Sequence, residues 1–342
     1  MDRNKIKSMN KLIVILLFVP FFGISQIYHL DPCGVVYTVD SFKTSGTWTK
    51  PANLSHIYVF MIAGGGGGKG GRRGAASSNR AGGGGRSGGI VLSKFMAADL
   101  NSTESVVVGT GGSGGAAVTA DNTNSSNAGS GGNSTFKYGA TYSIGGGTGA
   151  IGGATSIITT SGSAPAQALS GKSSAFISSY ALRTALGTTA ASDATRDMAI
   201  ETAGNWVSTS SCGGNINNTN VQTNSGTVPG YYDFTYTLQN EVSGVGEGVN
   251  GTSPTSSLSI GSYLQRWFFD WLDPDDITSL MPRSGGGGGP GDTAGTIAGG
   301  SGAAGIGYGA AGGGGGASTN GANSGAGAAG NDGIVIFINV YN

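Results

Sequence analysis

The sequence contains few of the residues on which enzymes and metalloproteins depend. Among 342 residues there are 2 His, 2 Cys and 9 Pro, and charged residues make up only 11% of the chain. No serine lies in the sharp-turn motif that presents the nucleophile of a hydrolase. His29, Cys33, His56 and Cys212 lack the spacing of a zinc finger. The sequence therefore predicts no enzyme, no catalytic residues, no metal site and no cofactor.

An excess of charge of either sign is also absent, because the formal net charge is zero. Proteins that bind nucleic acids usually carry a basic excess that neutralises phosphates, so we expect no nucleic-acid partner. Residues 41–98 nevertheless contain eight basic residues and no acidic one. We interpret this stretch either as a solvated loop face or as a patch for an acidic surface glycan, with Arg72 and Arg73 as candidate contacts.

Long hydrophobic runs are absent except at the N-terminus. The apolar run 12–22 follows four basic residues and precedes Gly23 and Ser25. This order is typical of a secretory signal peptide, and the run is shorter than the roughly 20 residues that span a bilayer. We therefore expect residues 1–25 to be removed after Ser25. The mature protein is then secreted or at the cell surface, without a transmembrane segment.

Only two cysteines remain after this cleavage. In an oxidising compartment Cys33 and Cys212 could form a disulfide that ties the mature N-terminus to the middle of the chain. Two free buried cysteines are the alternative, and the sequence leaves both open.

What the sequence does have is glycine, with 68 of 342 residues, against about 7% in ordinary proteins. Disorder usually combines low hydrophobicity with high net charge, whereas this chain is 37% hydrophobic and neutral. The glycines follow no strict three-residue period, which excludes collagen. Polyglycine can instead form an extended threefold helix without internal hydrogen bonds, which neighbouring helices can bond laterally. We expect short β-strands to frame a core of such polyglycine II helices, in a mainly β fold.

Short runs of β-branched and aromatic residues, bounded by Gly, Ser or Asn, predict strands. The final stretch, 331–342, alternates in hydrophobicity, and we expect it to pair with 56–62. A hairpin is expected to turn at residues 139–140. The remaining strand predictions are 46–50, 88–95, 104–109, 134–139 and 141–145.

The glycine content divides the chain into four parts: the signal peptide 1–25, a glycine-rich half 26–154, an inserted region 155–284 and a second half 285–342. We expect the insertion to be mixed α/β or irregular, with a helix at 173–186 and a strand at 231–238. Its aromatic cluster is either the insertion's core or a binding surface for sugars or proteins, and it comprises Tyr263, Trp267, Phe268, Phe269 and Trp271.

The order of these elements resembles the glycine-rich domains of bacteriophage tail-fibre tip adhesins and of secreted bacterial proteins. The resemblance covers about residues 40–154 and 284–342, so the insertion falls outside it, and a signal peptide favours a bacterial exported protein. It implies a β-framed core of packed polyglycine II helices, with exposed loops at one end that recognise a receptor. It rests on FKTSGTWTKPANLSHIYVFMIAGGGGGKGG, GGRSGGIVLSKF, STESVVVGTGGSGG, GGNSTFKYGATYSIGGGTG and NDGIVIFINVYN.

These features together favour a non-enzymatic, secreted or cell-surface adhesin-like protein whose partner is a surface glycan or a surface protein. A purely structural extracellular role is the alternative. Ice binding is a third class. It requires a regular three-residue period with small residues on one face, which the sequence does not display.

Overall fold

The fold is known from a computed structural model in which the described chain is mainly β. Among the described residues the helical part is a 3₁₀ turn, η2 (Ala97–Asp99). The description covers residues 28–30, 36–80, 82–138, 140–144, 167–169, 210–223, 247–253, 282 and 284–342.

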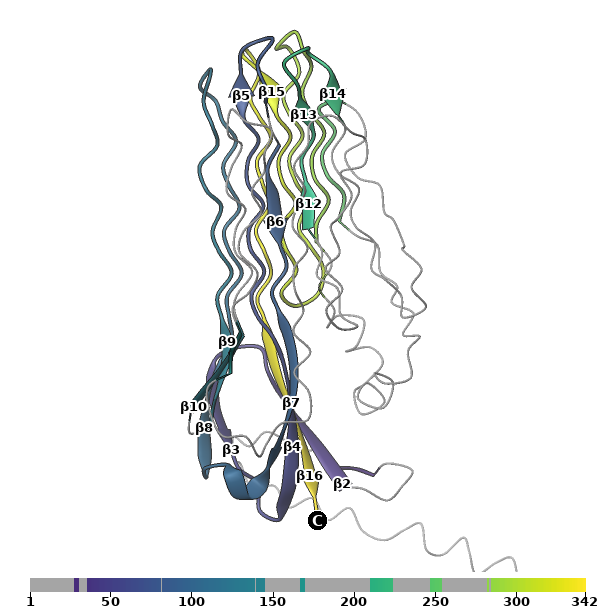
Figure 1. Ribbon diagram of the computed structural model, residues 1–342. Coiled ribbons are helices and arrows are strands. Elements are labelled where there is room, and N and C mark those ends of the chain that lie inside the picture. Colours follow the sequence, from purple (N-terminus) through teal and green to yellow (C-terminus); the bar gives the residue numbers. More distant parts are fainter. Residues whose placement is uncertain are drawn as a thin grey trace, which may run out of the picture.

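The strands of the described residues fall into two five-stranded sheets and three two-stranded pairs. Figure 1 shows the two larger sheets together at one end of an elongated molecule, where the C-terminus also lies. The strands are β1 (Tyr28–Leu30), β2 (Val36–Phe42), β3 (Gly46–Thr49), β4 (Leu54–Ile62), β5 (Arg73–Gly74), β6 (Gly84–Arg86), β7 (Ile90–Met96), β8 (Thr103–Val107), β9 (Ser134–Tyr138), β10 (Ala140–Ile144), β11 (Gln167–Leu169), β12 (Ser210–Cys212), β13 (Asn215–Ile216), β14 (Gln222–Thr223), β15 (Ser318–Thr319) and β16 (Ile334–Tyr341).

The first sheet has the order β1-β2-β16-β4-β7, and the last strand of the chain lies at its centre. Phe337 of β16 pairs with Val59 of β4 on one side and with Asp40 of β2 on the other. The predicted pairing of the C-terminal strand with 56–62 is therefore confirmed. Strand β2 was not predicted, although it supplies one neighbour of β16.

The second sheet has the order β11-β10-β9-β8-β3. Tyr138 pairs with Ala140, which confirms the predicted hairpin of β9 and β10.

An aromatic core joins the two sheets. The ring of Trp48 stacks on Phe337 with centroids 5.4 Å apart, and Phe136 meets Phe337 edge-on at 5.0 Å. All three side chains are buried, so this core fixes one sheet against the other.

Beyond the sheets the glycine runs form extended segments that run side by side to the far end of the molecule (Figure 1). Ten such segments lie among the described residues. In chain order they are g1 (63–73), g2 (82–89), g3 (109–118), g4 (125–133), g5 (213–216), g6 (247–253), g7 (284–291), g8 (298–304), g9 (309–318) and g10 (324–333).

Hydrogen bonds between these segments recur at every third residue. In g1 the backbone N–H groups of Gly65, Gly68 and Gly71 donate to carbonyls of g10 at 2.9, 2.8 and 3.0 Å. Those of Gly64 and Gly67 donate to g4, each at 3.0 Å. A repeat of three residues is also the period of an extended threefold helix.

Segment g9 lies at the centre of the bundle, with six of the other described segments around it. Each segment in this ring is also bonded to the next, so the seven are packed hexagonally. The central contacts are Gly312 N–H to Gly66 O in g1, Gly83 N–H to Gly315 O in g2, Ala317 N–H to Gly214 O in g5, Gly288 N–H to Gly314 O in g7, Gly313 N–H to Ala303 O in g8 and Gly325 N–H to Gly316 O in g10.

This central position explains the five consecutive glycines at 312–316. A Cβ atom built on any of them would lie between 1.7 and 2.1 Å from a carbonyl oxygen of another segment. None of the five has a φ in the left-handed region. The space between segments, and not the backbone conformation, therefore requires glycine here.

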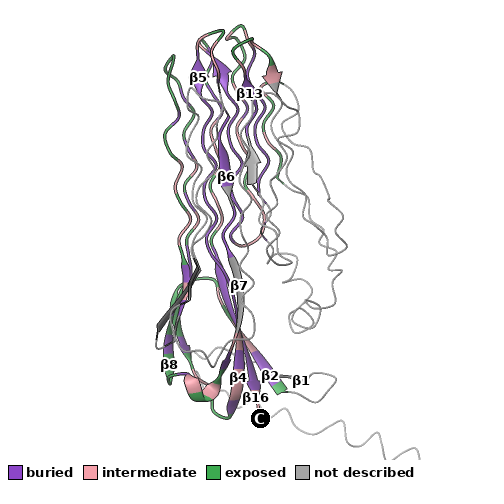
Figure 2. Cartoon of the chain, viewed as in Figure 1, coloured by how far each residue is buried: buried purple, intermediate pink, exposed green. Residues whose placement is uncertain are grey.

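Segment g3 lies at the edge of the bundle and tolerates side chains at every third position. Gly109, Gly112 and Gly115 are buried, whereas Thr110, Ser113 and Ala116 are exposed. The expectation that no regular three-residue period with small exposed residues exists is therefore wrong for this segment. Figure 2 shows the same trend, with buried residues along the central segments and exposed ones at the edge and at the far loops.

Two segments of the bundle come from the predicted insertion. Both g5 and g6 lie within residues 155–284, and each bonds to g7. The expected helix at 173–186, the strand at 231–238, the aromatic cluster and Cys33 lie outside the described residues. In the part of the chain that is described, no helix is long and apolar enough to cross a bilayer.

Candidate ligand-binding tip

Five of the described loops meet at the end of the bundle remote from the sheets, close to β5, β13, β14 and β15 (Figure 1). They join segments that run up the bundle to segments that run back, and we call them together the tip. The tip loops are residues 74–80, 119–124, 217–221, 292–297 and 319–323.

Asparagine side chains link the tip loops to one another. The Oδ1 atom of Asn122 accepts from the N–H of Ala75 at 3.0 Å and from Asn320 Nδ2 at 3.1 Å. Asn220 Oδ1 accepts from the N–H of Ser77 at 3.0 Å. Each bond crosses between loops that are far apart in the sequence, so the tip is a single connected surface.

The backbone of the tip adopts conformations that few residues favour. Ser77, Asn122 and Asn220 have positive φ angles of 59°, 54° and 58°. Such conformations cost free energy for residues other than glycine, and they persist where the surroundings hold them. The cross-links described above supply that restraint, and they keep the loops in one conformation.

Buried cations lie directly beneath these loops. Lys69, Arg72, Arg73 and Arg80 are all buried, and Arg80 is fully inaccessible. Arg80 donates to Ser78 O at 3.0 Å, to Asn220 Oδ1 at 2.7 Å and to Thr319 Oγ1 at 2.5 Å. Burial lowers the pKa of Arg80, and the nearby charge of Arg72 lowers it further.

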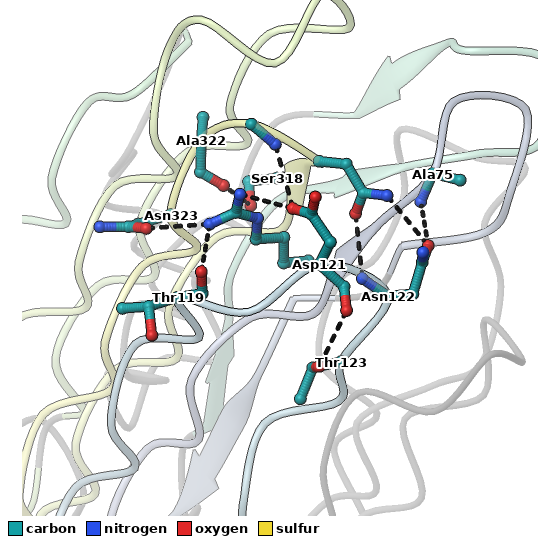
Figure 3. Close-up of polar contacts among 11 residues, drawn as sticks. Ala75, Thr119, Asp121, Asn122, Thr123, Ser318, Ala322 and Asn323 are labelled. Atoms are coloured by element: carbon teal, nitrogen blue, oxygen red, sulfur yellow. Dashed lines mark hydrogen bonds and ion pairs between the residues drawn. The ribbon is translucent and has the colours of Figure 1, made fainter.

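Arg72 and Arg73, the basic residues predicted to contact a ligand, lie beneath the tip and not on its surface. Arg72 is 6% exposed and donates to the carbonyl of Asn79. Arg73 is 8% exposed. Its Nη2 pairs with Asp121 Oδ1 at 2.5 Å, and its Nη1 donates to Thr119 O and Asn323 Oδ1 at 2.5 and 3.1 Å. Figure 3 shows these partners gathered around one guanidinium. Through these contacts both arginines hold the tip loops in position.

Asp292 anchors the loop 292–297. Its carboxylate accepts hydrogen bonds from the N–H groups of Thr296 and Ile297 at 2.8 and 2.9 Å, and from the Thr296 hydroxyl. Burial alone would raise the pKa of Asp292, but these bonds outweigh it and lower the pKa. Asp292 therefore stays ionised and engaged within its own loop.

Amide and hydroxyl groups dominate the exposed surface of the tip. Asn122, Asn218, Thr219 and Asn323 are exposed there. Asp121 is the exposed carboxylate among the described tip residues, with 54% of its side chain accessible, and Arg73 balances its charge. Sequence reasoning missed this set because the asparagines lie in four separate loops with no common motif.

Cys212 and His56, which the sequence analysis also considered, lie outside the tip. Among the described residues, no group of three or more His, Cys, Asp or Glu lies close enough to hold a metal ion. Cys212 ends β12, and its predicted partner Cys33 is not described. His56 lies on β4, with its ring edge-on to Tyr58.

Comparison with known proteins agrees with this fold. No curated protein gives a significant match. The sequence model of the glycine-rich domain family matches residues 39–338, which include β4, most of β2 and all ten segments of the bundle. The chain therefore belongs to the glycine-rich domain family.

Proposed function

We propose that the ten segments are packed polyglycine II helices that support an adhesive tip. The three-residue repeat of lateral hydrogen bonds and the lack of space for Cβ atoms favour this packing. Ordering a glycine costs roughly 0.5–1 kcal/mol more than ordering an alanine, and one hydrogen bond contributes about 0.5–1.5 kcal/mol. These terms nearly cancel, so the sheets that hold the segment ends decide the stability of the bundle.

The function that the geometry supports best is that of a secreted or cell-surface, non-enzymatic adhesin-like protein. One observation carries this proposal. Loops from distant parts of the chain are cross-linked at the far end of a rigid bundle, with exposed amides and hydroxyls held in place. A preorganised surface loses less entropy on binding. A cell-surface glycan or surface protein is the partner that such a tip would recognise.

Export from the cell rests on the N-terminal signal peptide expected at residues 1–25. A purely structural role in an extracellular matrix uses the same bundle without a ligand. The two functions differ in what the tip does, because a structural component tolerates any tip substitution that preserves folding.

Binding of the labelled chain from Gln26 onward to whole cells and isolated surface polysaccharides tests the proposal. We expect saturable binding that is lost when Ala76→Tyr and Ala294→Tyr obstruct two exposed tip loops. Thr47→Tyr, on the exposed face of β3, is the matched control and should bind normally. Loss of binding on Trp267→Ala with Trp271→Ala, and not on tip substitution, would move the site to the aromatic cluster. Binding by no variant, wild type included, favours the structural role.

Ice binding is a second candidate, favoured by the exposed period of Thr110, Ser113 and Ala116 in g3. In neighbouring g10, Ala326 is half-buried and Ala329 is exposed, at the same spacing of three residues. Small uncharged side chains on a rigid repeat are what an ordered water lattice requires. An ice recrystallisation assay decides this candidate, and ordinary crystal growth at high protein concentration would exclude it.

A further inference from the structure

We propose that Asp121 and Asn323, both oriented by the buried guanidinium of Arg73, form a subsite for a neutral sugar with adjacent hydroxyl groups. This inference rests on the proposed adhesive function of the tip and names the ligand class. It begins with the position of one cation, which lies beneath two exposed loops and contacts both.

Arg73 fixes which atom of each neighbour faces the solvent. A guanidinium only donates hydrogen bonds, so it must face an oxygen of each partner. Its Nη1 donates a hydrogen bond to Oδ1 of Asn323 at 3.1 Å, which leaves the Nδ2 donor group directed away from the guanidinium. Its Nη2 forms an ion pair with Oδ1 of Asp121 at 2.5 Å, which leaves Oδ2 as an acceptor. One buried cation therefore presents a donor and an acceptor on the same surface.

Further contacts hold the side chain of Asp121 and its loop in place. The N–H of Gly321 also donates to Asp121 Oδ1, at 3.2 Å. The next residue, Asn122, is bonded to the loops 74–80 and 319–323. Figure 3 shows Asp121 and Asn323 on either side of the guanidinium, with Asn122 beside Asp121. The subsite is therefore fixed before any ligand arrives.

The charge of the site indicates why the ligand is neutral. Asp121 and Arg73 compensate one another, so the pair has no net charge to attract an anionic sugar, and the more exposed member of the pair is the carboxylate. Separating the pair would leave a buried charge unpaired, which is strongly unfavourable.

Sugar hydroxyls match this arrangement because each one both donates and accepts. Two adjacent hydroxyls can donate to the carboxylate, in bonds that are stronger than neutral ones because the acceptor is charged. A hydroxyl or ring oxygen can accept from Asn323 Nδ2. A neutral hexose therefore uses both groups without displacing Arg73.

Binding of the chain from Gln26 onward to polysaccharide-coated surfaces, with methyl hexosides as soluble competitors, tests the subsite. Asp121→Asn and Asn323→Ala should each weaken binding about tenfold or more, which corresponds to about 1.4 kcal/mol. Asp332→Asn, which replaces an exposed carboxylate near the sheets, is the control and should bind as the wild type does. Thermal unfolding of each variant checks that the fold is intact.

Four outcomes are distinguishable. Competition by neutral hexosides, insensitive to salt and lost in both variants, supports the subsite. Saturable binding that both variants retain overturns the subsite and leaves the adhesive tip standing. Competition by uronates alone, weakened by salt, overturns the assignment of a neutral ligand. Absence of wild-type binding to every cell and polysaccharide overturns the subsite and the adhesive function together.

Discussion

A Cβ atom on Gly314 would lie 1.7 Å from the carbonyl oxygen of Gly83, the closest approach within the central run 312–316. Both atoms belong to backbone that is held by hydrogen bonds: Gly83 donates to Gly315 O at 2.9 Å, and Gly314 O accepts from Gly288 at the same distance. Neither segment can shift without breaking such bonds. The position of Gly314 therefore sets how closely g2 and g9 pack.

Gly314→Ala is expected to lower the free energy of unfolding by about 3 kcal/mol or more, because overpacking of a close-packed interior commonly costs 1–3 kcal/mol even where side chains can yield. Chemical denaturation measures this. The control is Gly46→Ala on β3, whose Cβ would meet only the ring of Phe42, at 3.2 Å. Equal stability of the two variants would contradict the packing of g9.

The positive φ of Asn122 allows a test of whether the tip holds the backbone of loop 119–124 in this conformation. Asn122→Gly removes two side-chain bonds but suits the backbone, so we expect a loss of about 1 kcal/mol. Asn122→Ala removes the same bonds and adds about 1 kcal/mol of backbone strain. Thermal unfolding compares the two. An alanine variant as stable as the glycine variant would show that the loop does not hold this conformation.

His56 predicts a dependence of stability on pH. Burial, followed by the charge of Lys94, lowers the pKa of His56 from 6.5 to about 4. Between these values the unfolded chain binds more protons than the folded one, so stability falls as pH drops from 6.5 towards 4. Allowing for its partial exposure, we expect a loss of about 1–2 kcal/mol. His56→Gln should flatten this part of the pH profile, and an unchanged profile would show that His56 does not cause it.

The aromatic core should control the stability of the whole molecule. Phe337→Ala removes a fully buried ring that contacts Trp48 and Phe136, and such changes cost about 3–5 kcal/mol. Denaturation followed by tryptophan fluorescence measures it. Val107→Ala, at a 41% exposed position of β8, should change stability by less than about 0.5 kcal/mol. Similar losses in both variants would contradict the placement of the core.

Much of the frame could be predicted because strands leave a local signal. The alternation in 331–342 and the turn at 139–140 were sufficient to predict β16 and the hairpin of β9 and β10. The bundle was harder to predict, because its three-residue period belongs to contacts between segments. The central run 312–316 contacts other segments on every side and is uniformly glycine, so it shows no period in its own sequence. Only an edge segment such as g3 repeats visibly.

The tip could not be predicted for a related reason. Asn122 and Asn320 are nearly two hundred residues apart, and only the folded bundle brings their loops together. The basic residues Arg72 and Arg73 were noticed in the sequence. Their burial was not foreseeable, because it depends on segments contributed by later parts of the chain.

Backbone amide hydrogen exchange of the glycine runs tests the central claim most directly. In the hydrogen-bonded bundle, the amides of residues 64–68 and 312–316 should exchange slowly. They should become exchangeable together with those of β4 and β16, because one cooperative fold protects both. Exchange of the glycine amides at the rate of an unstructured chain, while β4 and β16 stay protected, would contradict the bundle.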